Sequence, residues 1–446
     1  MKYRVLIALV LMATVQSVYS NDISLSVYND DLAIVKISDV MTFRKGIQTI
    51  SFTDVSKRVD PTSVRFSTED GGINVIEQNF RYDLVNSQKV LERYIDKMIT
   101  LWINEGELIE GILLSVTGDV VLSDTDSNIK IVKLQSIERF DFPELPEGLI
   151  TKPTLFWKLN SDRTTETATE ISYMTAGFDW HAEYTAVIDE NETEMEVSLW
   201  VSIDNNSGAT YENAKLKLIA GDVNRVRPQE MIKRMPATLA VTQENAVAGF
   251  EERGLFEYHL YELQGRTTVN NAEIKQISLF PNTNVKEEKI LIYDPLINPT
   301  RVTANVEFTN SESDGLGMPL PAGIVRVYKT DTDGSIEFIG EDSIKHTPKN
   351  EKVRLVLGTS FDIVAERRVA DSKRISRTII EESIEISLRN RKEETVIITA
   401  VEHFWRDWEI ISKSDNFVKK DANTAEFTVE IPADSEKIIS YTVRHR

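Results

Sequence analysis

The chain has 446 residues, of which 51 are lysine or arginine and 71 are aspartate or glutamate, so its formal net charge at pH 7 is −20. This acidic excess argues against nucleic acids and anionic membrane surfaces as partners. The sequence contains no cysteine, which excludes disulfides, thiolate nucleophiles and cysteine-ligated metal centres. A chain of this length is expected to form about two to four domains held together by core packing.

Residues 1–20 have the order of a secretory signal peptide. A basic start, residues 1–4, precedes an uncharged apolar run, residues 5–15, and Ser20 ends the segment before a predicted cleavage site at Asn21. The apolar run would rise only about 16 Å as a helix, against about 30 Å of bilayer hydrocarbon, which favours cleavage over a membrane anchor. We therefore expect an exported protein, periplasmic or secreted, with no transmembrane segment after cleavage.

Short alternating runs separated by turn residues predict a small antiparallel β-domain over residues 21–83. Apolar residues near helical spacing predict a helix over residues 84–95. Five short β-like runs follow, separated by turn-forming segments: residues 98–103, 108–115, 120–122, 129–134 and 137–140. A leading helix and five strands within residues 84–145 resemble an Sm-like or SH3-like small barrel. Such barrels often bind RNA, but eleven acidic and five basic residues between Leu91 and Leu145 argue against nucleic acid here.

A linker with two prolines, residues 142–148, separates this barrel from a longer β region. Its clearest strand has a uniformly apolar face: Met195, Val197, Leu199, Val201 and Ile203. Residues 221–250 lose the alternation and predict a long loop, and strands resume at 255–262, 274–279, 289–293 and 302–308. The spacing of strands and turns predicts a central β-sandwich domain over residues 150–350 and a C-terminal immunoglobulin-like β-sandwich over residues 360–446. The predicted fold class is therefore all-β and multi-domain.

Several separated motifs carry a resemblance to a known family. They are residues 171–184, residues 205–208 followed by 211–214, residues 320–328, and residues 338–342 with 346–348. In this order they resemble the C-terminal domain of mucoidy-inhibitor-like proteins, a bacterial exported family of unknown function, over roughly residues 150–446. Some members have a long coiled coil before this domain. This chain has the small-barrel pattern there, so a role tied to the coil does not transfer, and the resemblance implies fold and export rather than an activity.

No strong catalytic motif is present. Five histidines lie far apart in the sequence, without the i, i+4 pair of a zinc helix: His181, His259, His346, His403 and His445. The sequence also lacks a nucleophile elbow, a phosphate-binding loop and a dinucleotide fingerprint. The Asp-rich segments 124–128 and 331–334 resemble fragments of calcium loops, but each lacks the downstream glutamate, so hairpin turns are favoured. We predict no catalytic residue, metal or cofactor.

Tryptophans are the candidate binding residues. Trp180 and Tyr184 share a strand face with alanines and are expected in the core, whereas Trp200 lies on the polar face of its strand. Trp405 and Trp408 flank a predicted turn. Exposed tryptophans favour recognition of sugars or protein partners, so we predict binding surfaces around Trp200, or around Trp405 and Trp408.

These observations predict an exported, non-catalytic binding or structural protein of the bacterial cell envelope, whose partner is an envelope protein or a polysaccharide. The alternative is an envelope-directed hydrolase using paired carboxylates. A cleft with two carboxylates about 5–10 Å apart would favour the hydrolase. A flat aromatic patch or an unpaired sheet edge would favour binding, and assembly into oligomers through such an edge stays open.

Overall fold

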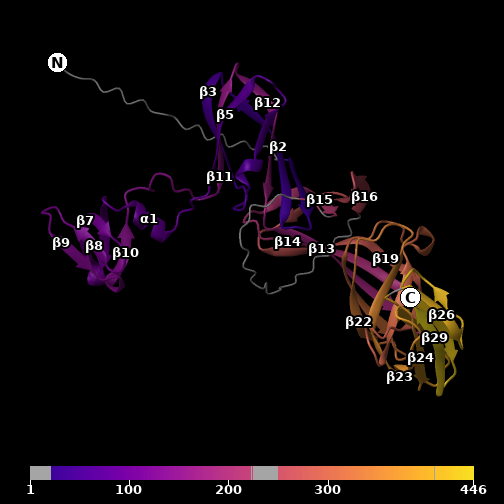
Figure 1. The fold of residues 1–446 in the computed structure, drawn as a ribbon. Coiled ribbons are helices and arrows are strands. Elements are labelled where there is room, and N and C mark those ends of the chain that lie inside the picture. Colours follow the sequence, from indigo (N-terminus) through magenta and orange to yellow (C-terminus); the bar gives the residue numbers. More distant parts are fainter. Residues whose placement is uncertain (1–21, 222, 225–249, 406) are drawn as a thin grey trace, which may run out of the picture.

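The computed structural model describes residues 22–221, 223–224, 250–405 and 407–446 (Figure 1). Within these residues the strands form four sheets, and there is one α-helix, α1 (Ser87–Arg93). The predicted all-β class is therefore confirmed. The predicted signal peptide and nearly all of the predicted loop at 221–250 lie outside the described residues. In the described part of the chain no helix is both long enough and apolar enough to cross a membrane.

The first sheet joins the start of the chain to its middle. Its strands are β1 (Asp22–Tyr28), β2 (Leu32–Phe43), β4 (Arg65–Thr68), β12 (Thr165–Thr175), β15 (Tyr211–Ala220), β16 (Phe250–Leu255), β17 (Tyr258–Leu263) and β18 (Thr267–Val269). Their order is β16-β17-β15-β1-β2-β12-β4, with β18 beside β15. Strand β1 runs antiparallel to β2 and parallel to β15, so that Leu25 lies between Val35 and Leu216.

A second sheet of three strands packs onto the same core. It consists of β3 (Gly46–Thr53), β5 (Ile73–Arg81) and β11 (Thr154–Ser161), in the order β3-β11-β5, and the short helix η1 (Pro61–Ser63) lies between β3 and β4. Trp157 from β11 is fully buried, and its ring centroid lies 5.1 Å from that of Phe66 in β4. Buried residues from 25–59 and from 155–355 form one continuous cluster, which we call the first core.

Residues 87–141 form a separate five-stranded sheet with its own small core. Its elements are α1, β6 (Met98–Ile103), η2 (Asn104–Gly106), β7 (Glu107–Ser115), β8 (Val120–Ser123), β9 (Ile129–Val132), η3 (Leu134–Ser136) and β10 (Ile137–Asp141). The order is β10-β6-β7-β8-β9, and no pairing between β9 and β10 closes it among the described residues. The helix begins later than predicted because the Asn86 side chain accepts a hydrogen bond from the Lys89 backbone N–H at 2.9 Å and caps it. In Figure 1 this sheet stands apart from the others.

The largest sheet has thirteen strands and contains two cores. The strands are β13 (Phe178–Ile188), β14 (Glu194–Asn205), β19 (Glu273–Tyr293), β20 (Arg301–Thr309), β21 (Gly323–Thr330), β22 (Ile336–Ile344), β23 (Lys352–Arg374), β24 (Ile380–Asn390), β25 (Val396–His403), β26 (Trp408–Lys413), β27 (Val418–Lys419), β28 (Thr424–Ile431) and β29 (Ser435–His445), with η4 (Glu312–Asp314) after β20. The main path is β22-β21-β13-β14-β19-β20-β23-β24-β29-β26, and β25 joins β19 to β28, which also pairs β27.

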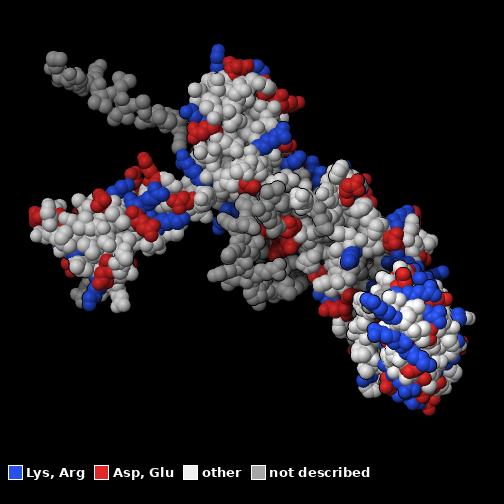
Figure 2. Space-filling view, viewed as in Figure 1, with Lys and Arg blue, Asp and Glu red and all other residues white. Residues whose placement is uncertain are grey.

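Two long strands run from the first core into a second one. In β19, Val285 is buried in the first core and Leu291 in the second, and in β23 the same is true of Leu355 and Ile363. The second core, the cluster of buried residues between 291 and 443, lies among β19, β20, β23–β25, β28 and β29. The boundary predicted between residues 350 and 360 therefore falls inside β23. Acidic and basic side chains are intermixed over the face shown in Figure 2.

One predicted strand was wrong, and two others belong to a single longer strand. The strand predicted at 255–262 is a hairpin of β16 and β17, in which Phe256 adopts a φ of 58° at the turn. The strands predicted at 274–279 and 289–293 are both parts of β19, which is 21 residues long. Glu287, between them, and Lys289, at the start of the second, stand at positions where the alternation calls for apolar residues, and this interrupted the period-two pattern.

Candidate functional site

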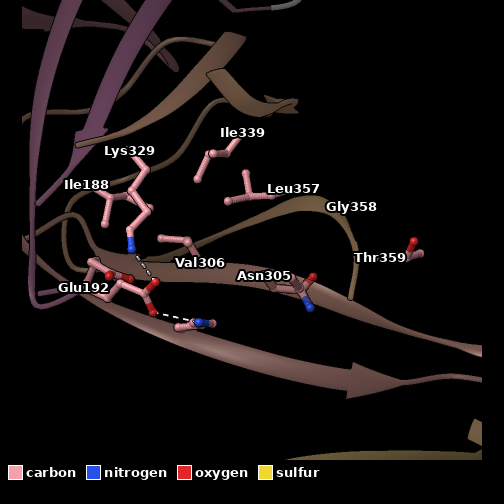
Figure 3. A pocket seen from close by; sticks show the side chains of 12 residues that line it. Ile188, Glu192, Asn305, Val306, Lys329, Ile339, Leu357, Gly358 and Thr359 are labelled. Atoms are coloured by element: carbon pink, nitrogen blue, oxygen red, sulfur yellow. Dashed lines mark hydrogen bonds and ion pairs between the residues drawn. The ribbon is translucent and has the colours of Figure 1, made fainter. Parts of the chain in front are cut away.

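A pocket opens where the first core gives way to the second (Figure 3), with a cavity volume of about 280 Å³. It is lined by side chains from six strands and one turn: Ile188, Glu192, Glu287, Lys289, Ala304, Asn305, Val306, Lys329, Ile339, Leu357, Gly358 and Thr359. Val306 belongs to the first core and Ala304 packs against the second. An apolar cavity with a few convergent polar groups at such a junction is the usual form of a small-molecule site.

Irregular strand pairing frames the pocket. The register between β20 and β23 shifts at Ala304 and Asn305, and a second shift lies in the pairing of β21 with β22. Gly358, beside the first shift, has a φ of 155°, which favours glycine. Gly340 has the same φ, and a Cβ there would lie 2.5 Å from the carbonyl oxygen of Leu357. Bulges of this kind bend a sheet and redirect side chains, and here they leave room between the strands.

The turn between β13 and β14 presents Glu192 to the pocket. The Asp189 carboxylate accepts hydrogen bonds from the backbone N–H groups of Thr193 and Glu194 at 2.8 and 2.9 Å. The hydrogen bonds from the backbone N–H groups of Glu194 and Thr193 lower the pKa of Asp189. Glu192 adopts a φ of 55° in this turn. Thr193 also accepts a hydrogen bond through its carbonyl from the Glu287 backbone N–H, at 3.4 Å, which ties the turn to β19.

Glu192 holds the two lysines of the pocket. The Nζ atoms of Lys289 and Lys329 both donate to its carboxylate at 2.7 Å, and Figure 3 shows Lys329 and Glu192 approaching each other from opposite elements. Burial alone would raise the pKa of Glu192, but the hydrogen bonds and charges of the two ammonium groups outweigh burial and lower it. Glu192 is therefore an ionised carboxylate with its negative charge compensated.

Glu287 lacks any such partner. Both of its carboxylate oxygens are shielded from solvent, and neither has a hydrogen-bond partner in the described chain. Burial, followed by the charges of Glu192 and Asp189, raises the pKa of Glu287 to about 7, although Lys289 and Lys329 act in the opposite direction. A buried polar group without a partner is costly and rare in native folds. Near neutral pH this side chain can therefore release or take up a proton, and its oxygens can accept hydrogen bonds from a ligand.

These pocket residues were not among those predicted from the sequence, although the sequence carries a signal for them. On β19 the inward positions continue from Val285 through Glu287 and Lys289 to Leu291, and Val285 and Leu291 are buried. On β21 the inward positions Val325 and Val327, also buried, are followed by Lys329. Charged residues at positions that a strand directs inward are the pattern that could have revealed the site.

The predicted tryptophan sites lie elsewhere. Trp200 is half-buried on β14, opposite Glu183 and Ser278 of the neighbouring strands. Trp405 is 84% exposed just before β26. Trp408 begins β26, stacks on Phe404 with ring centroids 4.4 Å apart, and donates from Nε1 to the Ala422 carbonyl at 2.6 Å. The structure brings Trp405 and Trp408 near one strand end and leaves Trp200 on another strand. None of the three lines the pocket.

The other residues considered in the sequence have structural roles, in the core or in turns. Trp180 and Tyr184 are buried in the first core, as predicted. The Asp124 carboxylate accepts hydrogen bonds from the backbone N–H groups of Asp126 and Asn128, and that of Asp333 from Ser335, so these acids close hairpin turns. Among the described residues no group of three or more metal-ligating side chains is gathered.

The comparisons with known proteins place these features in a family. The family model described as "Domain of unknown function (DUF4139)" matches residues 169–446. This range contains every residue that lines the pocket. No curated protein matches the sequence significantly. Because the family model covers more than half of the sequence, the chain belongs to the DUF4139 family.

Proposed function

We propose that this chain is an exported, non-catalytic binding protein of the bacterial cell envelope, and that the pocket between the two cores holds a small-molecule ligand. The observation that carries the proposal is the pair of Glu287 oxygens, which are shielded from solvent and without partners beside a cavity. Leaving a buried acceptor unsatisfied costs about 1–3 kcal/mol. A ligand with a hydrogen-bond donor toward Glu287 and an apolar part against Ile188, Val306 and Leu357 would remove that cost.

The export part of the proposal is supported by the signal-peptide order of residues 1–20 and by the absence of cysteine. It is supported as well by the resemblance of residues 150–446 to the exported mucoidy-inhibitor-like proteins. N-terminal sequencing of the chain recovered from the periplasm of an expressing bacterium tests it. We expect the mature protein to begin at Asn21, and an intact Met1 would contradict export by cleavage.

A binding role is also supported by the five-stranded sheet. We infer from its strand order and its leading helix that it is an Sm-like or SH3-like module, and that the region around the second core is an immunoglobulin-like sandwich. Strands β9 and β10 have a free edge in the described chain. The outward face of the sheet exposes Met98, Ile112 and Ile129, with Met98 opposite Ile112. Free edges and exposed apolar faces are features of partner-binding surfaces, which agrees with an envelope protein as a partner.

One observation favours the alternative, an envelope-directed hydrolase. The pKa of Glu287 near 7, in a pocket that also contains Glu192, is what a general acid requires. The two lysines bound to Glu192 weigh against it, because they make that carboxylate a poor base and nucleophile. Binding without chemistry is therefore the better-supported function.

Two variants of neighbouring residues separate these functions. Glu287→Gln alters the pocket, whereas Glu288→Gln alters an exposed carboxylate on the other face of β19. Native mass spectrometry of each protein after exposure to a small-molecule extract of bacterial periplasm is the measurement. We expect a bound mass with wild type and Glu288→Gln that is lost in Glu287→Gln. No bound mass, or an equal one in all three proteins, would contradict the proposal. Soluble fragments released from purified peptidoglycan by wild type but not by Glu287→Gln would establish the hydrolase instead.

A further inference from the structure

The charges around Glu287 do not balance. The charged groups that act on it are Glu192 and Asp189 from the turn, Lys289 on its own strand and Lys329 on β21. The other lining residues, from β13, β20, β22 and β23, carry no charge. With Glu287 ionised, two carboxylates and two ammonium groups line the pocket, and Asp189 in the turn beside it adds a third carboxylate that acts on Glu287. The site is therefore one positive charge short.

None of the donors that line the pocket bonds to the Glu287 carboxylate in the described chain. Both lysines donate to Glu192 at 2.7 Å. The amide of Asn305 is committed as well, because its Nδ2 donates to the carbonyls of Ile290 and Thr303 at 3.2 and 3.1 Å. The two Glu287 oxygens thus need hydrogen-bond donors that the surrounding strands do not supply.

The remaining walls define the other end of a ligand. Ile188, Val306 and Leu357 are aliphatic, and Ile339, at the exposed rim, is 37% exposed. Burying an apolar group against such side chains contributes about 25 cal/mol for each Å² removed from water. A ligand that satisfies the whole pocket therefore combines an apolar body with a group that is both cationic and a hydrogen-bond donor.

We propose that the ligand of this pocket is a small organic ammonium ion, with its cationic group against Glu287 and its hydrocarbon part against the aliphatic wall. This inference rests on the proposed function of the pocket as a small-molecule site. A hydroxyl would supply a donor without the missing charge, and a carboxylate would add repulsion to three acids. An ammonium group supplies three N–H donors and the positive charge together.

Proton linkage gives the proposal a distinct signature. The pKa of Glu287 in the empty pocket is about 7, so at lower pH an arriving ammonium ion must displace a proton. The affinity should rise about tenfold per pH unit up to about pH 7 and become constant above it. A neutral ligand that accepts a hydrogen bond from the protonated carboxyl would instead bind less tightly as the pH rises, and a ligand that does not contact Glu287 would show no pH dependence.

The test uses three probes of equal length on the full mature chain: hexylammonium, 1-hexanol and hexanoate. Isothermal titration calorimetry at pH 6, 7 and 8, in about 0.15 M salt to screen the acidic surface, gives the affinities. We expect hexylammonium to bind at least tenfold more tightly than 1-hexanol at pH 8, to weaken about fivefold between pH 7 and 6 and about tenfold between pH 8 and 6, and hexanoate not to bind. Equal affinities for the three probes, or no binding of hexylammonium, would overturn the inference.

Three variants connect the binding to the pocket. Glu287→Gln should weaken hexylammonium at least tenfold and remove its pH dependence, while Glu288→Gln should leave both unchanged. Ile339→Trp, a change at the rim, should block every probe, and unchanged binding there would assign the binding to the protein surface and overturn the inference. If 1-hexanol or hexanoate binds best and Ile339→Trp abolishes that binding, the pocket is a small-molecule site and only the ammonium assignment fails. Far-ultraviolet circular dichroism confirms that each variant is folded.

Discussion

Two glutamates in the same large sheet, Glu402 and Glu287, are shielded from solvent in opposite ways. Glu402 on β25 is 1% exposed, and Arg367 Nε donates to both of its oxygens, at 2.9 and 3.1 Å. The Tyr441 hydroxyl donates to it as well, at 2.5 Å. Glu287, at the end of the first core, has no partner for either oxygen. Burial by itself therefore does not mark a functional group, whereas burial without partners beside a cavity does.

The difference follows from which elements meet at each residue. Within the second core, β23 supplies Arg367 and β29 supplies Tyr441, so two strands contribute donors to Glu402. Burial, followed by the charge of Glu402, raises the pKa of Tyr441, which keeps its hydroxyl a donor. At the junction the strands that surround Glu287 contribute mainly aliphatic side chains and two lysines that bind Glu192, and none of their polar groups bonds to Glu287 in the described chain. A buried carboxylate whose oxygens have hydrogen-bond partners stabilises the fold, whereas a buried carboxylate without partners leaves room for a ligand.

The largest effect should come from removing one member of the buried ion pair between Arg367 and Glu402. Arg367→Met leaves the Glu402 carboxylate buried with only Tyr441 as a partner, and removing one member of a buried ion pair costs about 3–5 kcal/mol. Urea denaturation should show this loss in the free energy of unfolding. Adding Glu402→Leu should restore most of it. The control is Arg368→Met, which removes an exposed pair with Glu385 and should cost less than about 1 kcal/mol. Equal losses of stability for Arg367→Met and Arg368→Met would contradict the difference expected between a buried and an exposed ion pair.

The next effect concerns stability against pH. The folded pKa of Glu287 is raised from 4.5 to about 7, so between these pH values the folded state retains a proton that the unfolded state has lost. Its contribution to the free energy of unfolding should fall by about 2 kcal/mol from pH 4.5 to 7, after allowing for partial solvent screening, and stay constant above pH 7.

The measurement for this effect is the difference between wild type and Glu287→Gln in unfolding experiments at pH 4.5, 6, 7 and 8. We expect the variant to gain relative stability as the pH rises, because the amide has no charge to desolvate. Glu288→Gln, on the exposed face of the same strand, is the matched control and should follow wild type. A difference that does not change with pH would show that Glu287 titrates as it does in the unfolded chain.

A smaller effect should follow from giving Glu287 partners. Glu192→Gln removes a nearby negative charge and releases Lys289 and Lys329, both of which can then compensate Glu287. The pKa of Glu287 should therefore fall by about one unit or more. Carbon-13 NMR titration of labelled glutamate carboxyls measures it. Glu190→Gln, an exposed change in the same turn, should leave the titration unaltered, and a rise in the pKa of Glu287 in Glu192→Gln would refute the arrangement.

The smallest effect is expected for an aromatic residue without partners. Trp405 is 84% exposed, and Trp405→Ala should change the free energy of unfolding by less than about 0.5 kcal/mol. Trp408 stacks on Phe404 and donates to Ala422, so Trp408→Ala should cost clearly more in the same urea experiment. A loss for Trp405→Ala as large as that for Trp408→Ala would mean that Trp405 has contacts in solution that this fold does not provide.

Part of the fold could be predicted from local pattern. The alternation of residues 195–203 predicted the buried face of β14, and the alternation at Trp180 and Tyr184 predicted two core residues. The strands of the five-stranded sheet were predicted with nearly correct bounds because turns rich in Asn, Asp and Gly separate them. The candidate site was not predicted in the same way, because Glu287 lies between the predicted strands 274–279 and 289–293, where charged residues interrupt the alternation.

The sequence by itself determined the all-β class, because the period-two alternation and the turn residues are local properties of the chain. It also carried the motifs of the family that includes residues 169–446. Only the tertiary structure decided that β1 pairs with β15, with partners 191 residues apart, and that β19 and β23 each pass through two cores. It also decided which buried glutamate has partners. Strand pairing and hydrogen-bond saturation depend on residues distant in sequence, so no local pattern contains them.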